Sequence, residues 1–300
     1  MPKILITGGL GYVGTELCDV LSRYPQNEIT VIDNRSIPNL VLKLVSKGIR
    51  FHQRDLFNIK DLLASTDICY HLAGITDVPQ VASQSTPEKD AEITRIGTEG
   101  TRYIIENIYP FAKIIFASTQ VVYDGLTEEK LNIDETFQPC PAVAYSKSKY
   151  QSELDLLNSP IQCIIARFAS VYGYNENIRW KILPNLFSKM AAQNQDLKVF
   201  GDKNYKPLIG INDLAELLLF FGQRNYNKEI FHCVDKNVRV IDIANLCQQY
   251  NPNIKIKITE DETPNKGFTL SNKKVKESGF VFTQTLEFEI AKMIKSWKNK

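Results

Sequence analysis

A glycine-rich turn near the start of the chain constrains its fold more than any other feature. The apolar run Ile4-Leu5-Ile6 is followed at once by Thr7-Gly8-Gly9-Leu10-Gly11-Tyr12-Val13-Gly14. Glycines at this spacing allow a sharp turn after a buried strand, close approach of the backbone to a pyrophosphate, and tight packing of the next helix on the strand. The segment therefore predicts a phosphate-binding turn between a strand and a helix.

A second apolar run supports this interpretation. Ile29-Thr30-Val31-Ile32 ends in Asp33, about twenty residues beyond the glycines, where a dinucleotide-binding unit carries an acidic residue for the ribose. The glycine turn and Asp33 together predict a dinucleotide site.

Short apolar runs then alternate with helical patterns along the first half of the chain. Strands are expected at 3–7, 28–33, 49–53, 67–72, 113–118 and 161–166, and long helices at 88–108 and 143–157. This alternation predicts an α/β fold with a Rossmann-type, doubly wound parallel sheet.

The alternation of short apolar runs with helical patterns changes after Arg167. Helices are expected near 180–193 and 212–222, and a strand at 229–234. We expect a dinucleotide-binding domain over 1–168 and a smaller mixed lobe for substrate over 169–300. The division is discontinuous because the strand at 229–234 is expected to return to the main sheet.

Composition excludes several function classes. Lysine plus arginine total 36 and aspartate plus glutamate total 34, so no strong field favours nucleic acid or an anionic membrane. No apolar stretch approaches the roughly eighteen residues of a membrane span, and a core strand at the N-terminus leaves no room for a signal peptide. We expect a cytoplasmic protein.

The six cysteines lack the spacing of metal ligands, and we expect reduced, mostly structural thiols and no metal site. Cys140 is the exception, because it lies between two prolines just before the helix expected at 143–157. The cysteines are Cys18, Cys69, Cys140, Cys163, Cys233 and Cys247.

The segment Tyr145-Ser146-Lys147-Ser148-Lys149 places a tyrosine and a lysine on one face of a helix. An ammonium beside a phenol favours the phenolate, which lets the tyrosine move a proton while hydride passes to a nicotinamide. Taken alone, the motif is better explained by an exposed helix with solvated side chains. Ser118-Thr119, at the end of the strand 113–118, adds a hydroxyl at the sheet edge where ligands bind.

These motifs together resemble the extended short-chain dehydrogenases/reductases of the nucleotide-sugar epimerase/dehydratase family, including the UDP-glucose 4-epimerase type. The resemblance spans nearly the whole chain. Besides the glycine turn and Tyr145 to Lys149, it includes Val31-Ile32-Asp33-Asn34, Arg54-Asp55-Leu56, His71-Leu72-Ala73-Gly74, Ala117-Ser118-Thr119 with Val121-Val122-Tyr123, and Arg167 to Gly173.

The resemblance implies NAD as cofactor and a role for individual residues. Thr119, Tyr145 and Lys149 would be the catalytic trio, Asp33 would bind the adenosine ribose, and Asp55 and Leu56 would border the adenine. The carboxylate of Asp33 disfavours a 2′-phosphate, whereas Arg35 leaves NADP open. The full cofactor set implied is Gly8, Gly11, Tyr12, Val13, Gly14, Asp33, Asn34, Asp55, Leu56, Leu72, Ala73, Gly74, Ser118, Tyr145, Lys149 and Phe168. The substrate set is Thr76, Thr119, Ser170 and Lys206.

Several positions depart from the family pattern. Gln120-Val121 replaces the Asp-Glu pair of the sugar 4,6-dehydratases, which argues against that reaction. On the substrate side, Ser170 replaces a usual asparagine and Lys206 a usual arginine, which has a bidentate fork that lysine lacks. Further departures are Thr94 for asparagine, Tyr174 for proline, Pro207 for aspartate, and Lys266 as the only counterpart of a C-terminal arginine. Lys206 and Lys266 are equally well explained as solvated lysines.

Three hypotheses follow. The first is an NAD-dependent epimerase that oxidises a nucleotide sugar transiently at C4, with Tyr145 as acid and base. The second is an NAD(P)H-dependent reductase of a keto-sugar nucleotide or another carbonyl compound, and the third is a non-catalytic dinucleotide-binding protein. The resemblance also implies a homodimer paired through the helices at 88–108 and 143–157.

Overall fold

The computed structural model describes residues 1–75, 85–259 and 267–298. The chain forms two compact units. Unit 1 comprises Met1–Asp124, Pro139–Arg167 and Ala215–Phe231, and unit 2 comprises Gly125–Gln138, Phe168–Leu214 and His232–Lys300.

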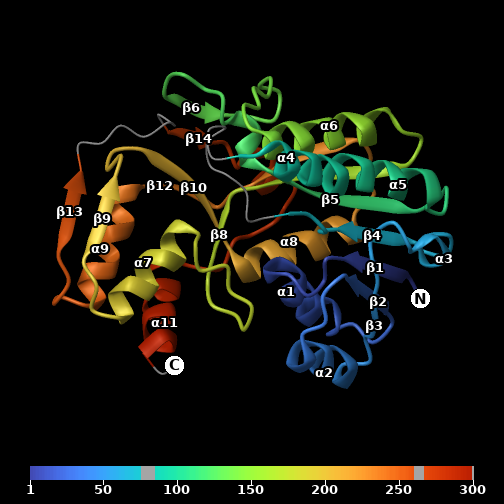
Figure 1. Ribbon diagram of the computed structural model, residues 1–300, viewed down its shortest axis with the longest axis horizontal. Helices are drawn as coiled ribbons and strands as arrows, with labels where there is room; N and C mark the ends of the chain where they lie inside the picture. The colour runs from blue at the N-terminus through green and yellow to red at the C-terminus, as the bar shows by residue number, and fades with distance from the viewer. Residues whose placement is uncertain (76–84, 260–266, 299–300) are drawn as a thin grey trace. The chain divides into compact units, whose positions relative to one another are not determined.

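A seven-stranded sheet forms the centre of unit 1 (Figure 1). Its strands are β1 (Lys3–Thr7), β2 (Glu28–Asp33), β3 (Arg50–Gln53), β4 (Ile68–His71), β5 (Lys113–Thr119), β7 (Gln162–Phe168) and β11 (Glu229–Cys233). They follow the order β11-β7-β5-β4-β1-β2-β3. The pairs β1–β2, β1–β4, β2–β3 and β4–β5 are parallel. The strand order reverses between β1 and β4, and doubly wound sheets bind ligands at the carboxyl ends of strands at such a point.

Helices cover both faces of this sheet. They are α1 (Tyr12–Leu21), α2 (Pro38–Ser46), α3 (Lys60–Leu63), α4 (Pro87–Thr94), α5 (Gly100–Asn107), α6 (Ala144–Asn158) and α8 (Ile211–Gln223), with a π-helical stretch η2 (Arg95–Glu99) and a 3₁₀ turn η3 (Gln120–Tyr123). Figure 1 shows α4, α5 and α6 on one side and α1 and α8 on the other.

Alternation along the strands produces the two covered faces. Cys69 and Ile114 pack in one cluster with Ile104 of α5 and Leu156 of α6. Tyr70 points the other way, and its ring lies against Gly222 of α8. Because both faces are covered, the strands are continuous apolar runs, and β5 is buried from its second residue to its last.

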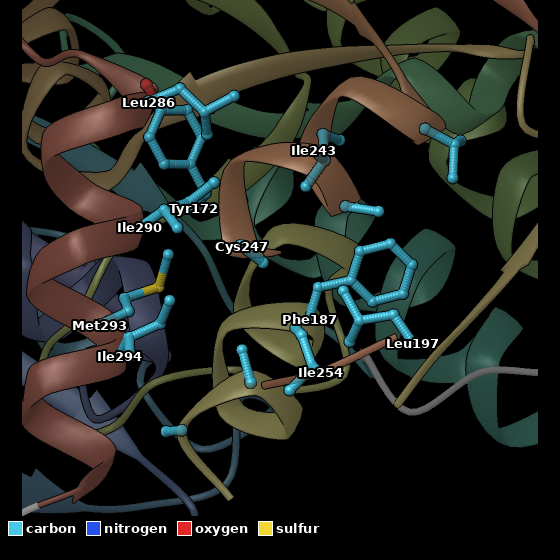
Figure 2. Packing of buried hydrophobic residues seen from close by; sticks show 14 of the residues in the cluster. Tyr172, Phe187, Leu197, Ile243, Cys247, Ile254, Leu286, Ile290, Met293 and Ile294 are labelled. Atoms are coloured by element: carbon cyan, nitrogen blue, oxygen red, sulfur yellow. The ribbon is translucent and has the colours of Figure 1, made fainter. Parts of the chain in front are cut away.

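The described part of unit 2 forms three small sheets and its own apolar core. Its strands are β6 (Lys130–Ile133), β8 (Ser170–Tyr172), β9 (Leu197–Phe200), β10 (Tyr205–Gly210), β12 (Lys236–Arg239), β13 (Ile256–Thr259) and β14 (Phe268–Leu270); its helices are α7 (Leu183–Ala192), α9 (Val240–Tyr250), α10 (Lys273–Glu277) and α11 (Leu286–Lys298). The core joins α7, α9 and α11 through Phe187, Cys247, Ile290, Met293 and their neighbours (Figure 2).

The fold class predicted from the sequence is confirmed. The helix expected over 88–108 runs from Pro87 to Asn107 and includes η2, which the sequence did not indicate. The two units also divide the chain differently from the expected ranges 1–168 and 169–300. Ala215–Phe231 lies in unit 1, because α8 buries its apolar side on the sheet and β11 pairs at the sheet edge next to β7.

Candidate active site

The turn after β1 is built so that only glycine fits at its first position. Gly8 has φ +69°, and a Cβ on it would lie 2.8 Å from the Cα of Ala73. The Gly8 amide donates to the carbonyl of Ile32 at 2.8 Å, which ties the turn to the end of β2. Gly14 is equally confined, since a Cβ there would lie 2.7 Å from the Gly8 carbonyl oxygen.

Helix α1 starts directly from this turn. Gly11 is its N-cap and provides no side-chain hydrogen bond to the first helical amides. Such amides, together with the helix dipole, form an anion site. The close packing at Gly8 and Gly14 and the uncapped start of α1 therefore fit the pyrophosphate of a dinucleotide.

Asp33 lies at the carboxyl end of β2, beside the turn. It is 4% exposed, and it accepts hydrogen bonds from the Leu10 amide at 3.2 Å and the Arg35 amide at 3.0 Å. The Arg35 guanidinium donates to the same carboxylate at 3.1 Å. An acceptor-rich carboxylate at this place suits ribose hydroxyls. Farther on, Asp55 is exposed and accepts from the Phe57 amide, whereas Leu56 is buried.

The segment after β4 runs beside the glycine turn. The Leu72 amide donates to the Thr7 carbonyl, and the Ala73 amide donates to Thr7 Oγ1 at 3.2 Å. His71 is held between two threonines, with Nδ1 2.8 Å from Thr7 Oγ1 and Nε2 3.2 Å from Thr101 Oγ1. Burial lowers the pKa of His71 to about 3, so this ring is neutral at physiological pH.

Lys149 of α6 reaches the carboxyl ends of β4 and β5. Its side chain is buried, and Nζ donates to the Ala117 carbonyl at 2.7 Å and lies 4.6 Å from the centroid of the Phe116 ring. Gly74 faces the same ammonium, since a Cβ on it would lie 3.5 Å from Nζ. Burial lowers the pKa of Lys149 to about 8, and the Glu153 carboxylate opposes this shift.

The other two members of the predicted trio lie on the same unit. Thr119 is the last residue of β5, 7% exposed, and its Oγ1 accepts from the Val121 amide at 3.1 Å. Tyr145 is the second residue of α6, is half-buried, and stands one turn before Lys149. A pocket of about 530 Å³ adjoins Tyr145. Its lining residues are Ser85, Asp90, Ile93, Thr94, Thr98, Arg102, Ala142, Val143, Ala144, Tyr145, Lys147, Ser148 and Gln151.

Ser118, which the resemblance assigned to the cofactor, has another partner. Its hydroxyl donates to Glu153, which is fully buried and paired with Arg167 at 2.6 Å. Arg167 also donates to the Tyr123 hydroxyl at 2.6 Å. Neither Glu153 nor Arg167 had a predicted role. The available signal was the position of Glu153, four residues after Lys149 on one helix face.

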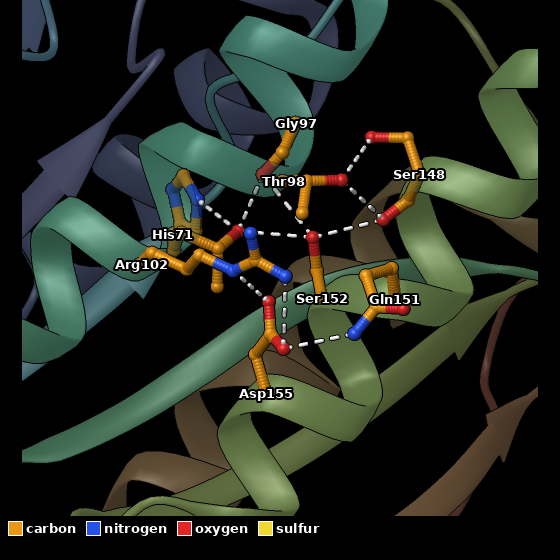
Figure 3. Close-up of polar contacts among 9 residues, drawn as sticks. His71, Gly97, Thr98, Arg102, Ser148, Gln151, Ser152 and Asp155 are labelled. Carbon is orange, nitrogen blue, oxygen red and sulfur yellow. Dashed lines mark hydrogen bonds and ion pairs between the residues drawn. The ribbon is translucent and has the colours of Figure 1, made fainter.

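Hydroxyl groups join α6 to the helices that cross it (Figure 3). Thr98 Oγ1 lies 3.0 Å from Ser148 Oγ, and the Ser152 hydroxyl donates to the Gly97 carbonyl at 3.1 Å. Arg102 forms an ion pair with Asp155 at 2.7 Å at the outer edge of this contact. These bonds orient α6, which carries Tyr145 and Lys149.

Of the other predicted residues, Tyr12 and Val13 begin α1, and Asn34 directly follows β2. Phe168, Ser170 and Lys206 lie on unit 2. Thr76 and Lys266 lie outside the described residues. Phe168 and Ser170 are half-buried at the end of β7 and the start of β8. Lys206 lies on β10 opposite Val238 of β12. Lys206 is half-buried, and burial lowers the pKa of its ammonium.

Comparison with known proteins identifies the family. A family model described as "NAD dependent epimerase/dehydratase family" matches residues 4–233 of this chain. A UDP-glucose 4-epimerase of Mycoplasma pneumoniae is 28% identical over 67% of this chain and 63% of its own length, less than two thirds. A UDP-N-acetyl-alpha-D-glucosaminuronate decarboxylase of Bacillus cytotoxicus is 25% identical over 77% of this chain and 74% of its own.

Solved structures share the fold. The UDP-glucuronic acid 4-epimerase of Bacillus cereus, in complex with UDP-glucuronic acid and NAD, superposes with a TM-score of 0.85 and 20% identity, covering 99% of both chains. Within the described residues, no helix combines the length and apolar character needed to cross a membrane. The chain belongs to the NAD dependent epimerase/dehydratase family, with NAD as its cofactor.

Proposed function

We propose that this protein is an epimerase that inverts C4 of a nucleotide sugar by oxidising the C4 hydroxyl transiently to a keto group. The observation that carries the proposal is the placement of Tyr145 and Lys149 one turn apart on α6, with Lys149 buried against the ends of β4 and β5. Those strand ends adjoin the glycine turn, so the proton-transfer residues and the dinucleotide site share one sheet edge.

The residues have distinct tasks in this mechanism. The glycine turn and Asp33 would hold NAD, which when bound would supply the acceptor and donor of the hydride at C4 of the sugar. Tyr145 takes the proton of the C4 hydroxyl and later gives it back, which as positioned acid–base catalysis contributes roughly 10² to 10⁴ in rate. The Lys149 ammonium stabilises the phenolate of Tyr145. Thr119 supplies a hydroxyl to hold the reacting oxygen.

Inversion requires the 4-keto sugar to turn before it is reduced on its other face. The sugar must therefore be held by its nucleotide rather than by its ring. Lys206 is proposed as a ligand of the diphosphate, because a cation whose burial lowers its pKa gains from an anionic partner. Thr76 and Ser170 are proposed as further substrate contacts. Two of the relatives described above are 4-epimerases of UDP-sugars, which supports reaction at C4.

One observation favours a second function, that of an NAD(P)H-dependent keto-sugar reductase. The Arg35 guanidinium lies on the Asp33 carboxylate at 3.1 Å and has a half-exposed side chain. A cation there partly neutralises the carboxylate that disfavours a 2′-phosphate. A reductase would use the same Thr119, Tyr145 and Lys149 with an exchangeable cofactor.

The test is turnover of sugar nucleotides by the purified holoenzyme, followed by proton NMR. We expect interconversion of UDP-glucose and UDP-galactose, or of the corresponding uronic acids, without net change in NAD. Tyr145→Phe should reduce the rate at least a hundredfold while NAD remains bound. Tyr150→Phe, a tyrosine variant on the same helix outside the trio, should retain the rate. Stoichiometric oxidation of NAD(P)H with a 4-keto sugar would instead establish the reductase, and activity in Tyr145→Phe would refute the assigned acid and base.

We also propose that the protein is a cytoplasmic homodimer. The pairing would use α4, α5 and α6, which correspond to the paired helices expected at 88–108 and 143–157. The family resemblance supports this assembly.

A further inference from the structure

A buried acid stands one turn beyond Lys149. The side chain of Glu153 has no exposed surface, and that of Arg167 is 2% exposed. Charged side chains are almost never fully buried unless they are paired. The position of Glu153 on α6, four residues after Lys149 and eight after Tyr145, puts all three on one helix face.

The oxygens of Glu153 are surrounded by donors. Arg167 Nε donates to Oε1 at 3.0 Å and Arg167 Nη2 donates to Oε2 at 2.6 Å, a two-pronged contact. The Ser118 hydroxyl also donates to Oε1. An ionised carboxylate, which only accepts, suits this set of donors. The Tyr123 hydroxyl holds the far side of the guanidinium, so the negative charge has a fixed position.

The groups around Lys149 differ in what they do to its charge. From β5 it meets the Ala117 carbonyl and the Phe116 ring, both of which favour a cation. His71 of β4 interacts with Lys149 electrostatically, and its ring is neutral because burial lowers its pKa to about 3. From α6, the Glu153 carboxylate opposes the lowering of the Lys149 pKa by burial.

We propose that Glu153 is a positioning residue that keeps Lys149 in its ammonium form, with Arg167 and Tyr123 holding the Glu153 carboxylate in place. The inference rests on the proposed function for the use of Lys149 beside Tyr145. Ser118 belongs to this arrangement, since its hydroxyl ends on Glu153. Ser118 of β5 and Arg167 of β7 thus both hold the Glu153 carboxylate, which acts on the charge of Lys149.

A purely structural role for the ion pair makes a different prediction. Breaking a buried pair leaves an unpaired charge and destabilises the fold, so Glu153→Gln alone can lose activity for that reason. The double variant Glu153→Gln/Arg167→Met removes both charges and leaves no unpaired one. If the pair only supports the fold, the double variant regains the wild-type behaviour of Lys149; if Glu153 supports the ammonium, it does not.

The first experiment titrates Lys149 directly in NAD-loaded protein labelled with ¹³C-lysine. The ¹³Cε resonance of Lys149 is assigned by its absence in Lys149→Met and followed from pH 6 to pH 11. We expect its titration midpoint to fall by about one pH unit or more in Glu153→Gln and in the double variant. Asp155→Asn, which removes an outward-facing acid on the same helix, should leave the midpoint unchanged.

The second experiment follows turnover against pH. Loss of the Lys149 proton at lower pH should move the alkaline limb of the rate profile downward by a similar interval in both variants. An unchanged midpoint in the folded double variant overturns the inference. If the midpoint is lowered in the variants but the wild-type protein turns over no sugar nucleotide, the inference is supported and the proposed function is refuted. The two failures are therefore distinct.

Discussion

At the scale of single residues, Gly8 combines two separate reasons to exclude a side chain. Its φ of +69° is a conformation that L-residues rarely adopt, and a Cβ would press on the backbone of Ala73. Gly48 has the same kind of φ, +74°, with no neighbour within 4 Å of its Cβ position. The two glycines therefore separate backbone strain from the close approach of the turn after β1 to the segment after β4.

We predict that Gly8→Ala reduces NAD affinity at least tenfold, about 1.4 kcal/mol, because the turn must move away from Ala73. Gly48→Ala should cost roughly 1–2 kcal/mol of stability from the left-handed backbone alone and leave NAD affinity unchanged. Titration calorimetry with NAD and urea unfolding of both variants provide the measurements. Equal NAD affinity in Gly8→Ala and wild type would mean that the turn does not hold the pyrophosphate.

At the scale of elements, the contact between η2 and α6 depends on a glycine and a ring of small hydroxyl residues. A Cβ on Gly97 would overlap Ser148 Oγ, which is itself hydrogen-bonded to Thr98 Oγ1. The π-helical stretch 95–99 lies at this contact (Figure 3). A π-helical turn contains about one residue more than an α-helical turn, so it changes locally which side chains face α6. Such segments often occur at functional sites.

Gly97→Ala should destabilise unit 1 by about 1–3 kcal/mol through overpacking, although alanine is the better helix former by about 1 kcal/mol. Adding Ser148→Ala should recover part of the loss, since it removes the overlapping oxygen. Thermal unfolding of the two single variants and the double variant gives the coupling between the positions. Additive losses would indicate that the helices do not meet at this pair.

At the scale of the whole molecule, the proposed homodimer places the outer surfaces of α4, α5 and α6 against a second copy. A stable interface buries about 800 Å² on each partner. A new charge within it would be desolvated without a partner, which strongly weakens association.

Sedimentation at micromolar concentration should give about twice the mass of one chain for the wild type. Gln151→Arg, on α6, should shift the mass toward that of one chain. Leu42→Arg, a matched change at an exposed position of α2, should not. A single-chain mass for the wild type at these concentrations would refute the dimer.

Local patterns in the sequence determined much of the fold. Strand and helix periods and the glycines at their spacing were sufficient to predict a doubly wound parallel sheet with a tight glycine turn after its first strand. The spacing of Tyr145 and Lys149 predicted a shared helix face. These signals are readable because each depends on residues within one strand, one turn or one helix.

Tertiary structure decided the rest. Glu153 meets Arg167 and Ser118 only after β5, α6 and β7 have packed together, and His71 finds Thr7 and Thr101 across two strands and a helix. The placement of Ala215–Phe231 with the sheet likewise follows from where α8 can bury its apolar side. The sequence by itself determined which residues could carry charge and move protons. Only the packed fold decided which of those charges lie in the interior, because burial and pairing depend on neighbours far along the chain.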